Sequence, residues 1–172
     1  MVEHIRLKSS RRRSQSGNSI LEITLILLPI LALAFAIFDF SMPIFLKSMF
    51  ESAVREGCRF GITYQMTWNG TTYSTQTAAI QAVVKSYALG LPSTSNINVK
   101  YYSPTSPYSQ LTGTGANSPG NILEVSIGTT VSSTYNWTPV APLWRDSSAL
   151  AIKAVSADRL EGLPAGTSPP SP

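Results

Sequence analysis

The sequence is poor in the residues from which most catalytic and metal sites are built. It contains one cysteine, Cys58, and one histidine, His4. A single cysteine excludes an intrachain disulfide, and a lone thiol is more often a small core residue than a reactive one. With the only imidazole close to the N-terminus, the rest of the chain has no Ser–His or Cys–His pair and no zinc site with the usual imidazole ligands.

The acidic residues add little support for catalysis. Beyond residue 50 the carboxylates are scattered, and their spacing brings no two of them together for acid–base work; they are Glu51, Glu56, Glu124, Asp146, Asp158 and Glu161. No glycine-rich phosphate loop or EF-hand spacing occurs. We therefore predict that the protein is not an enzyme and has no catalytic residues, no cofactor, no bound metal and no small-molecule substrate.

Unbalanced charge is confined to one end of the chain. The first seventeen residues carry five basic side chains against Glu3, whereas residues 18–172 carry equal numbers of basic and acidic ones. A basic, serine-containing stretch that runs directly into an apolar segment is typical of a topogenic signal. We therefore expect a membrane signal at this end, and no binding of nucleic acid.

The apolar segment is long enough to span a bilayer. Residues 23–38 hold no charge, and after Asp39 the apolar character resumes as far as Leu46. About 20 apolar residues cross a membrane, whereas a cleaved secretory signal needs an apolar core of about 7–15 and a small-residue cleavage site after it. The basic flank orients the N-terminus toward the cytoplasm. We predict a single transmembrane span at about 20–46 and export of the remainder.

The helical pattern continues beyond the predicted span. Seven small or apolar residues recur on one stripe at helical spacing: Leu46, Phe50, Ala53, Val54, Gly57, Cys58 and Gly61. A second face carries Lys47, Glu51, Arg55 and Arg59, in which Glu51 precedes Arg55 in the favourable order for an ion pair. We predict one helix over 18–62, bent or locally loosened at Pro29 and Pro43.

The pattern Gly57-x-x-x-Gly61 allows another backbone to come close. Packing against the strands of the same chain is favoured over a specific dimer motif. The residues that we assign to helix packing are Gly57, Gly61, Arg55 and Arg59.

The remainder predicts a small mixed domain over 63–161 and a disordered tail over 162–172. Residues 74–89 have the start and stop residues of a helix, 96–102 and 122–135 alternate as strands, and 148–159 favours a strand over a helix. Residues 103–121 are rich in Pro, Gly and Ser and predict a loop. The predicted fold class is α+β: a long N-terminal helix, one further helix and an antiparallel sheet of about three strands.

Two ionisable residues fall at membrane depth, where such groups are costly and usually mark function or partner contact. Glu22 lies near the inner edge, where it could also reach the interface by extending its side chain. Asp39 follows about 26 Å further along the helix, near the outer edge. We therefore expect both residues to mark function or partner contact, and the resemblance described next implies that this contact is subunit assembly.

The residues around Glu22 resemble a class III signal, the prepilin-peptidase site of type IV pilin-like proteins. Residues 11–17 read RRRSQSG, followed by NSILE and then the apolar run. The resemblance implies cleavage between Gly17 and Asn18 and loss of a leader, residues 1–17. It makes Glu22 the fifth mature residue, whose carboxylate in that family meets the free α-amine of a neighbouring subunit.

Within that group the chain resembles the TadE-like proteins, minor pseudopilins of the tight-adherence (Flp) pilus. The similarity rests on Gly17 with Glu22, Pro29, the triplet at 38–40 and the segment at 53–59. It implies a non-catalytic part in assembling a type IVb pilus for surface adhesion, in the bacterial inner membrane. The implied partners are a prepilin peptidase and other pilins and pseudopilins of the system.

Two alternatives stay open. One is an uncleaved single-pass signal-anchor protein with an exported binding domain, for which Glu22 is coincidental. The other is a type II secretion pseudopilin, which also combines a long helix with a small domain.

Overall fold

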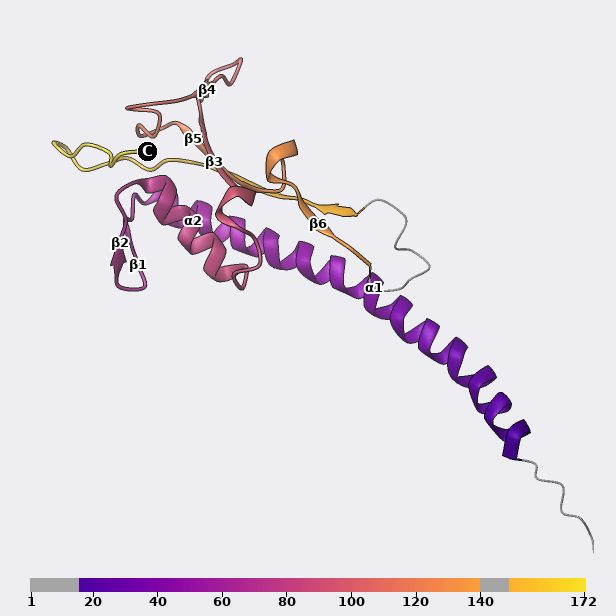
Figure 1. The fold of residues 1–172 in the computed structure, drawn as a ribbon. Coiled ribbons are helices and arrows are strands. Elements are labelled where there is room, and N and C mark those ends of the chain that lie inside the picture. The colour runs from indigo at the N-terminus through magenta and orange to yellow at the C-terminus, as the bar shows by residue number, and fades with distance from the viewer. Residues whose placement is uncertain (1–15, 140–148) are drawn as a thin grey trace, which may run out of the picture.

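A single long helix dominates the structure, a computed structural model that describes residues 16–139 and 149–172. This helix, α1, covers Ser16–Ile62 and contains Pro29 and Pro43 without interruption. Its first half projects away from the rest of the molecule, and its second half lies within the folded part (Figure 1). The predicted long helix is confirmed. We call residues 19–45 the exposed segment, and residues 46–139 and 149–172 the C-terminal domain.

The second half of α1 is buried along the stripe that the sequence predicts. All seven residues from Leu46 to Gly61 on that stripe are buried. The second helix, α2 (Gln76–Tyr87), covers one side of the stripe, and the Thr75 side chain caps it by accepting a hydrogen bond from the Ala78 backbone N–H at 3.2 Å. This N-cap satisfies one of the helix's otherwise unpaired donors, as expected for threonine at this position.

A four-stranded antiparallel sheet covers the other side of α1. Its strand order is β4-β3-β5-β8, with bounds β3 (Ile97–Tyr102), β4 (Gln110–Leu111), β5 (Ile122–Ile127) and β8 (Ala154–Arg159). The prediction of about three strands misses β4, which lies inside the segment predicted to be a loop. In the β3–β5 pair Lys100 lies directly opposite Glu124, a cross-strand pair of opposite charge that favours this register.

Two small two-stranded sheets complete the fold. The predicted last strand divides into β7 (Leu150–Ile152) and β8, and β7 pairs with β6 (Tyr135–Trp137). Near the end of α1, β1 (Thr67–Trp68) and β2 (Thr71–Thr72) form a hairpin. Asn69 and Gly70 at its tip both have positive φ, 49° and 78°, as a type I′ turn requires. Short 3₁₀ turns lie at Thr94–Asn96 and Val131–Ser133.

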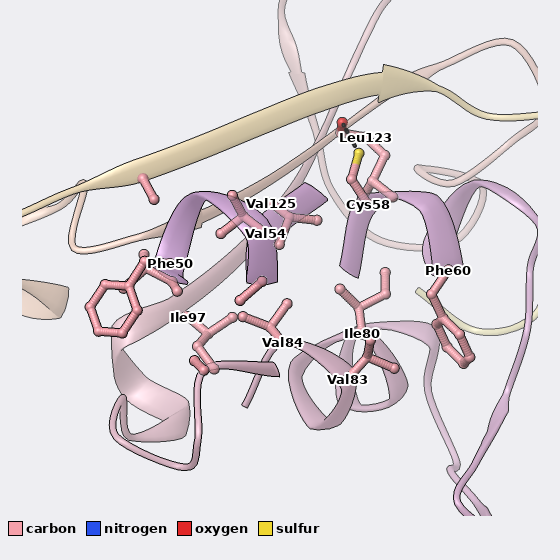
Figure 2. Close-up of a cluster of buried hydrophobic side chains, with 14 of the residues drawn as sticks. Phe50, Val54, Cys58, Phe60, Ile80, Val83, Val84, Ile97, Leu123 and Val125 are labelled. Carbon is pink, nitrogen blue, oxygen red and sulfur yellow. Dashed lines mark hydrogen bonds between the residues drawn. The ribbon is translucent and has the colours of Figure 1, made fainter. Parts of the chain in front are cut away.

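The core joins the helices to the sheet (Figure 2). Phe50, Val54 and Cys58 of α1 are fully or almost fully buried. They belong to one cluster with Ile80, Val83 and Val84 of α2 and with Leu123 and Val125 of β5. Phe50 also meets the ring of Tyr135 edge-on at 4.9 Å. That contact connects α1 to the β6–β7 sheet.

The last residues return to the domain, although their composition predicts a disordered tail. The Pro170 carbonyl accepts a hydrogen bond from Asn117 Nδ2 at 2.8 Å. The Ser171 carbonyl accepts one from the Gln76 backbone N–H, also at 2.8 Å. Both acceptors are backbone groups, which proline- and serine-rich sequences offer as well as any other. Residues 162–172 therefore have specific contacts at the start of α2.

Candidate functional site

The predicted processing site lies in the first turn of α1. Gly17 and Asn18 have helical backbone, and Glu22 follows about one turn later with an exposed side chain. Its neighbours Leu21 and Ile23 are 69% and 60% exposed. In the described part of the chain Glu22 forms no ion pair. A carboxylate on an apolar helix surface is stabilised in a membrane only when a cation reaches it, and such a cation must come from elsewhere.

Asp39 does not lie near Glu22. Both belong to the same helix, and the seventeen residues between them correspond to about 26 Å along its axis. Asp39 is half-buried whereas Glu22 is exposed. The two residues assigned to subunit assembly therefore lie at two separate positions on α1.

The surface between these positions is apolar and uncovered. Among the described residues, α1 is the one helix that is long and apolar enough to cross a membrane. From Ile20 to Phe40 the large apolar side chains along it are 44–77% exposed. Because contiguous apolar surface of this size is unfavourable in water, the segment requires lipid or other apolar helices around it.

Gly57 and Gly61 let α1 approach its neighbours within the same chain. A Cβ atom added at Gly57 would lie 2.3 Å from Val84 Cγ2, and one at Gly61 would lie 2.5 Å from Leu123 Cδ2 and 2.7 Å from Ile80 Cδ1. Both glycines are buried in the structure. They serve the contact of α1 with α2 and β5, so they are not available on the surface as a dimer motif.

Gly57→Ala is expected to destabilise the C-terminal domain by about 1–3 kcal/mol, the usual cost of overpacking a core. This destabilisation is expected even though helix propensity favours alanine over glycine by about 1 kcal/mol. Urea unfolding of the full chain in micelles, followed by tryptophan fluorescence, measures it. In a Val84→Ala background, which removes the clashing methyl group, the same substitution should cost much less. An equal cost in both backgrounds would contradict the proposed contact.

Arg55 and Arg59, also assigned to helix packing, lie outside the core. Arg55 pairs with Glu51 at 3.9 Å and Arg59 with Glu56 at 3.1 Å, and the arginine side chains are 72% and 77% exposed. The expected Glu51–Arg55 pair is therefore present. Exposed pairs of this kind contribute about 0–1 kcal/mol, so these arginines present charge at the surface of the domain.

Cys58 is a core residue in the structure, 2% exposed. Its Sγ lies 3.7 Å from the Leu123 carbonyl oxygen, to which the thiol donates weakly. Burial raises the pKa of the Cys58 thiol to about 11, so it is uncharged at neutral pH. A protonated, enclosed thiol is a poor nucleophile, which agrees with its predicted packing role.

The sequence did not single out Gln76, which is fully buried at the start of α2. Its Nε2 donates to the Gly61 carbonyl at 2.7 Å, and its Oε1 accepts from Asn117 Nδ2 at 2.6 Å and Tyr101 Oη at 3.3 Å. Burial also raises the pKa of Tyr101 to about 12. A glutamine on the apolar face of a predicted helix was the available signal. This network joins the end of α1 to α2, β3 and the loop before β5.

The comparisons with known proteins support this picture of α1. The family model described as TadE-like protein matches residues 17–59, which include the processing site, Glu22, Asp39 and both packing glycines. The comparison with curated proteins and the comparison with solved structures each gave no match. The matched family comprises pilus-system proteins, not enzymes. The match places residues 17–59 of the chain in the TadE-like protein family.

Proposed function

We propose that this chain is a minor pseudopilin that takes part in assembling a tight-adherence pilus used for surface adhesion. Family membership implies a role in the Tad pilus system, and the geometry of α1 supports the finer assignment. A prepilin peptidase removes residues 1–17, the exposed segment spans the cytoplasmic membrane with its N-terminus inside, and the C-terminal domain is exported.

The observation that carries this proposal is the division of α1 into two unlike halves. The large apolar side chains from Ile20 to Phe40 are exposed, while Leu46 and Phe50 are at most 1% exposed. The first half requires an apolar environment and the second half already has its own core. An assembly of parallel pilin-type helices provides that environment, and it brings the N-terminus of one subunit to the level of Glu22 on another.

Glu22 gives the proposed assembly its register. After cleavage the new α-amine on Asn18 is a cation at about the same membrane depth as Glu22, because the two residues are one helical turn apart. Pairing the amine of one subunit with the Glu22 carboxylate of its neighbour stabilises both charges in the bilayer. Other registers leave the carboxylate unpaired, so they are disfavoured.

Processing is the direct test. When the chain is expressed with a prepilin peptidase, the mature mass should begin at Asn18, and Gly17→Ala should abolish cleavage by blocking the site. The intact mass of membrane-extracted protein, with and without the peptidase, measures this. Ser16→Ala is the matched control and should be cleaved as wild type. An intact leader under every condition would make the protein a signal-anchor protein.

The same cells test assembly separately. The Glu22→Gln variant should still be cleaved, because Gly17 is intact. It should co-purify with the other pilins of the system at least about tenfold less than wild type, because the α-amine of the neighbouring subunit is left unpaired in the membrane. Glu51→Gln changes an exposed carboxylate in the C-terminal domain and should leave co-purification unchanged. Equal recovery of the Glu22 and Glu51 variants would remove Glu22 from the assembly contact.

A further inference from the structure

A cavity of about 330 Å³ lies at the end of α1 farthest from the exposed segment. Three elements line it and leave one side open to solvent: the last turns of α1, the β1–β2 hairpin with the residues before it, and the second half of α2. Figure 1 shows the hairpin beside α2 at this end of the helix. The volume is at the lower end of the range of about 300–1,000 Å³ found for ligand pockets.

Aromatic rings form one wall of the cavity. The Trp68 ring lies 5.8 Å from the Tyr87 ring at 38° and 5.9 Å from the Phe60 ring at 84°. A two-stranded hairpin is marginally stable alone, so the contacts of Trp68 hold the hairpin in place and fix its ring. Phe60 is 7% exposed but Tyr87 is 45% exposed. The wall therefore continues from the core out to solvent.

Several polar groups around this wall have no protein partner. Within residues 16–139 and 149–172, the Gln65 amide, Trp68 Nε1 and the Tyr87 hydroxyl make no hydrogen bond. Gln65 both donates and accepts, Trp68 only donates, and Tyr87 does both. A ligand that stacks on the rings would find donors and acceptors at their edges, which is the usual composition of a small-molecule pocket.

The charges at the cavity balance one another. Glu56 and Arg59 both line it and pair with each other at 3.1 Å. A cationic ligand would gain from Glu56 but be repelled by Arg59, and an anionic ligand would meet the reverse. The electrostatics therefore favour a neutral ligand that can hydrogen-bond with the paired charges.

We propose that this pocket binds a neutral carbohydrate. A sugar ring has an apolar C–H face that stacks on Trp68 and hydroxyl groups that both donate and accept, which matches Gln65, Tyr87 and the Glu56–Arg59 pair. A proline-rich peptide also uses aromatic grooves, but it advances about 3.1 Å per residue and needs an extended groove, whereas this pocket has a volume of about 330 Å³.

The location of the pocket suits a ligand outside the cell. Phe60 lies fourteen residues beyond Leu46 on one helix, or about 21 Å along the axis from the end of the predicted span. Carbohydrate binding goes beyond pilus assembly and does not require cleavage at Gly17. The pocket can therefore fail to bind a glycan while the assembly role stands, and it can bind a glycan even if the assembly role is wrong.

An array of immobilised glycans, probed with the full-length protein in lipid nanodiscs, tests the proposal. Nanodiscs replace glycoside detergents, whose sugar headgroups would compete for the pocket. The wild-type protein should bind a neutral glycan, and Tyr87→Ala and Gln65→Ala should each weaken that binding by about tenfold or more. Tyr108→Asn removes an exposed tyrosine from the loop between β3 and β4 and should bind as wild type.

Both pocket substitutions affect surface side chains, so loss of folding does not explain loss of binding; an unchanged urea midpoint verifies this. The proposal is overturned if the folded wild-type protein binds no glycan on the array, or if binding survives both substitutions unchanged. Capture by an immobilised proline-rich peptide in place of any glycan, lost in the same two variants, would also overturn it and assign the pocket to peptides.

Discussion

Phe50→Ala should lower the free energy of unfolding of the C-terminal domain by about 3–5 kcal/mol, the usual cost of truncating a buried aromatic residue. Phe50 is 0% exposed and meets Tyr135 edge-on at 4.9 Å, so its loss opens a cavity and loosens the contact with the β6–β7 sheet. Domains of this size have a total free energy of unfolding of about 5–15 kcal/mol, so the variant should be close to unfolding. Urea titration in micelles, followed by tryptophan fluorescence, gives the value.

The same helix offers a matched control. Phe40 is 75% exposed and belongs to the exposed segment, so Phe40→Ala should leave the unfolding midpoint of the C-terminal domain unchanged. A cost below about 1 kcal/mol for Phe50→Ala, or equal costs for the two substitutions, would show that α1 is not part of the domain's core.

Gln76→Leu is expected to lower the free energy of unfolding by at least about 3 kcal/mol. This loss is expected even though leucine has a similar volume and buries more apolar surface than glutamine. The substitution leaves the Gly61 carbonyl and the Tyr101 hydroxyl without their partner and deprives Asn117 of one acceptor. Each buried group left unsatisfied costs about 1–3 kcal/mol, and the members of a shared network reinforce one another. The measurement is the same urea titration.

Gln81 provides the comparison within α2. It is partly buried and makes one hydrogen bond, from Nε2 to the Ile97 carbonyl at 3.0 Å. Gln81→Leu should therefore cost about 0.5–1.5 kcal/mol. If both substitutions cost the same, the network around Gln76 contributes nothing beyond a single hydrogen bond, contrary to the geometry.

Periodicity predicted the elements that span many residues. Seven positions with helical spacing were enough to place the buried stripe of α1 from Leu46 to Gly61, because only one face of a helix can meet a core. Alternation likewise predicted β3 and β5. Each of these elements is long enough for its apolar residues to recur several times at the same spacing, so every recurrence supports the same assignment.

The short elements carried weaker signals. The β1–β2 hairpin has two residues in each strand, too few for alternation. Asn69-Gly70 between Thr67-Trp68 and Thr71-Thr72 is nevertheless a strong hairpin signal, and the predicted elements did not include it. That omission also hid the pocket beside Trp68. The strand β4 has two residues and lies in a segment rich in proline and glycine, so the sequence held no pattern for it.

Amino-acid composition does not predict contacts that are made by backbone groups. The tail over 162–172 is dominated by proline, glycine and serine, a composition that predicts disorder. Its hydrogen bonds to Gln76 and Asn117 nevertheless form through the backbone carbonyls of Ser171 and Pro170. For the candidate site the sequence was more informative. The predicted processing signal is a local pattern read in order along the chain, so Gly17 and Glu22 could be proposed for it without tertiary structure.

The absence of any loop between the exposed segment and the core has a mechanical consequence. As one helix of 47 residues, α1 is about 70 Å long and connects the exposed segment to the core without an intervening loop. Tilted by about 20° from the bilayer normal, as transmembrane helices commonly are, it would carry its distal end sideways by about 24 Å. A small rotation imposed on the N-terminal half is thereby converted into a large sweep of the other end. The direction in which the aromatic pocket faces would accordingly follow the orientation of the exposed segment.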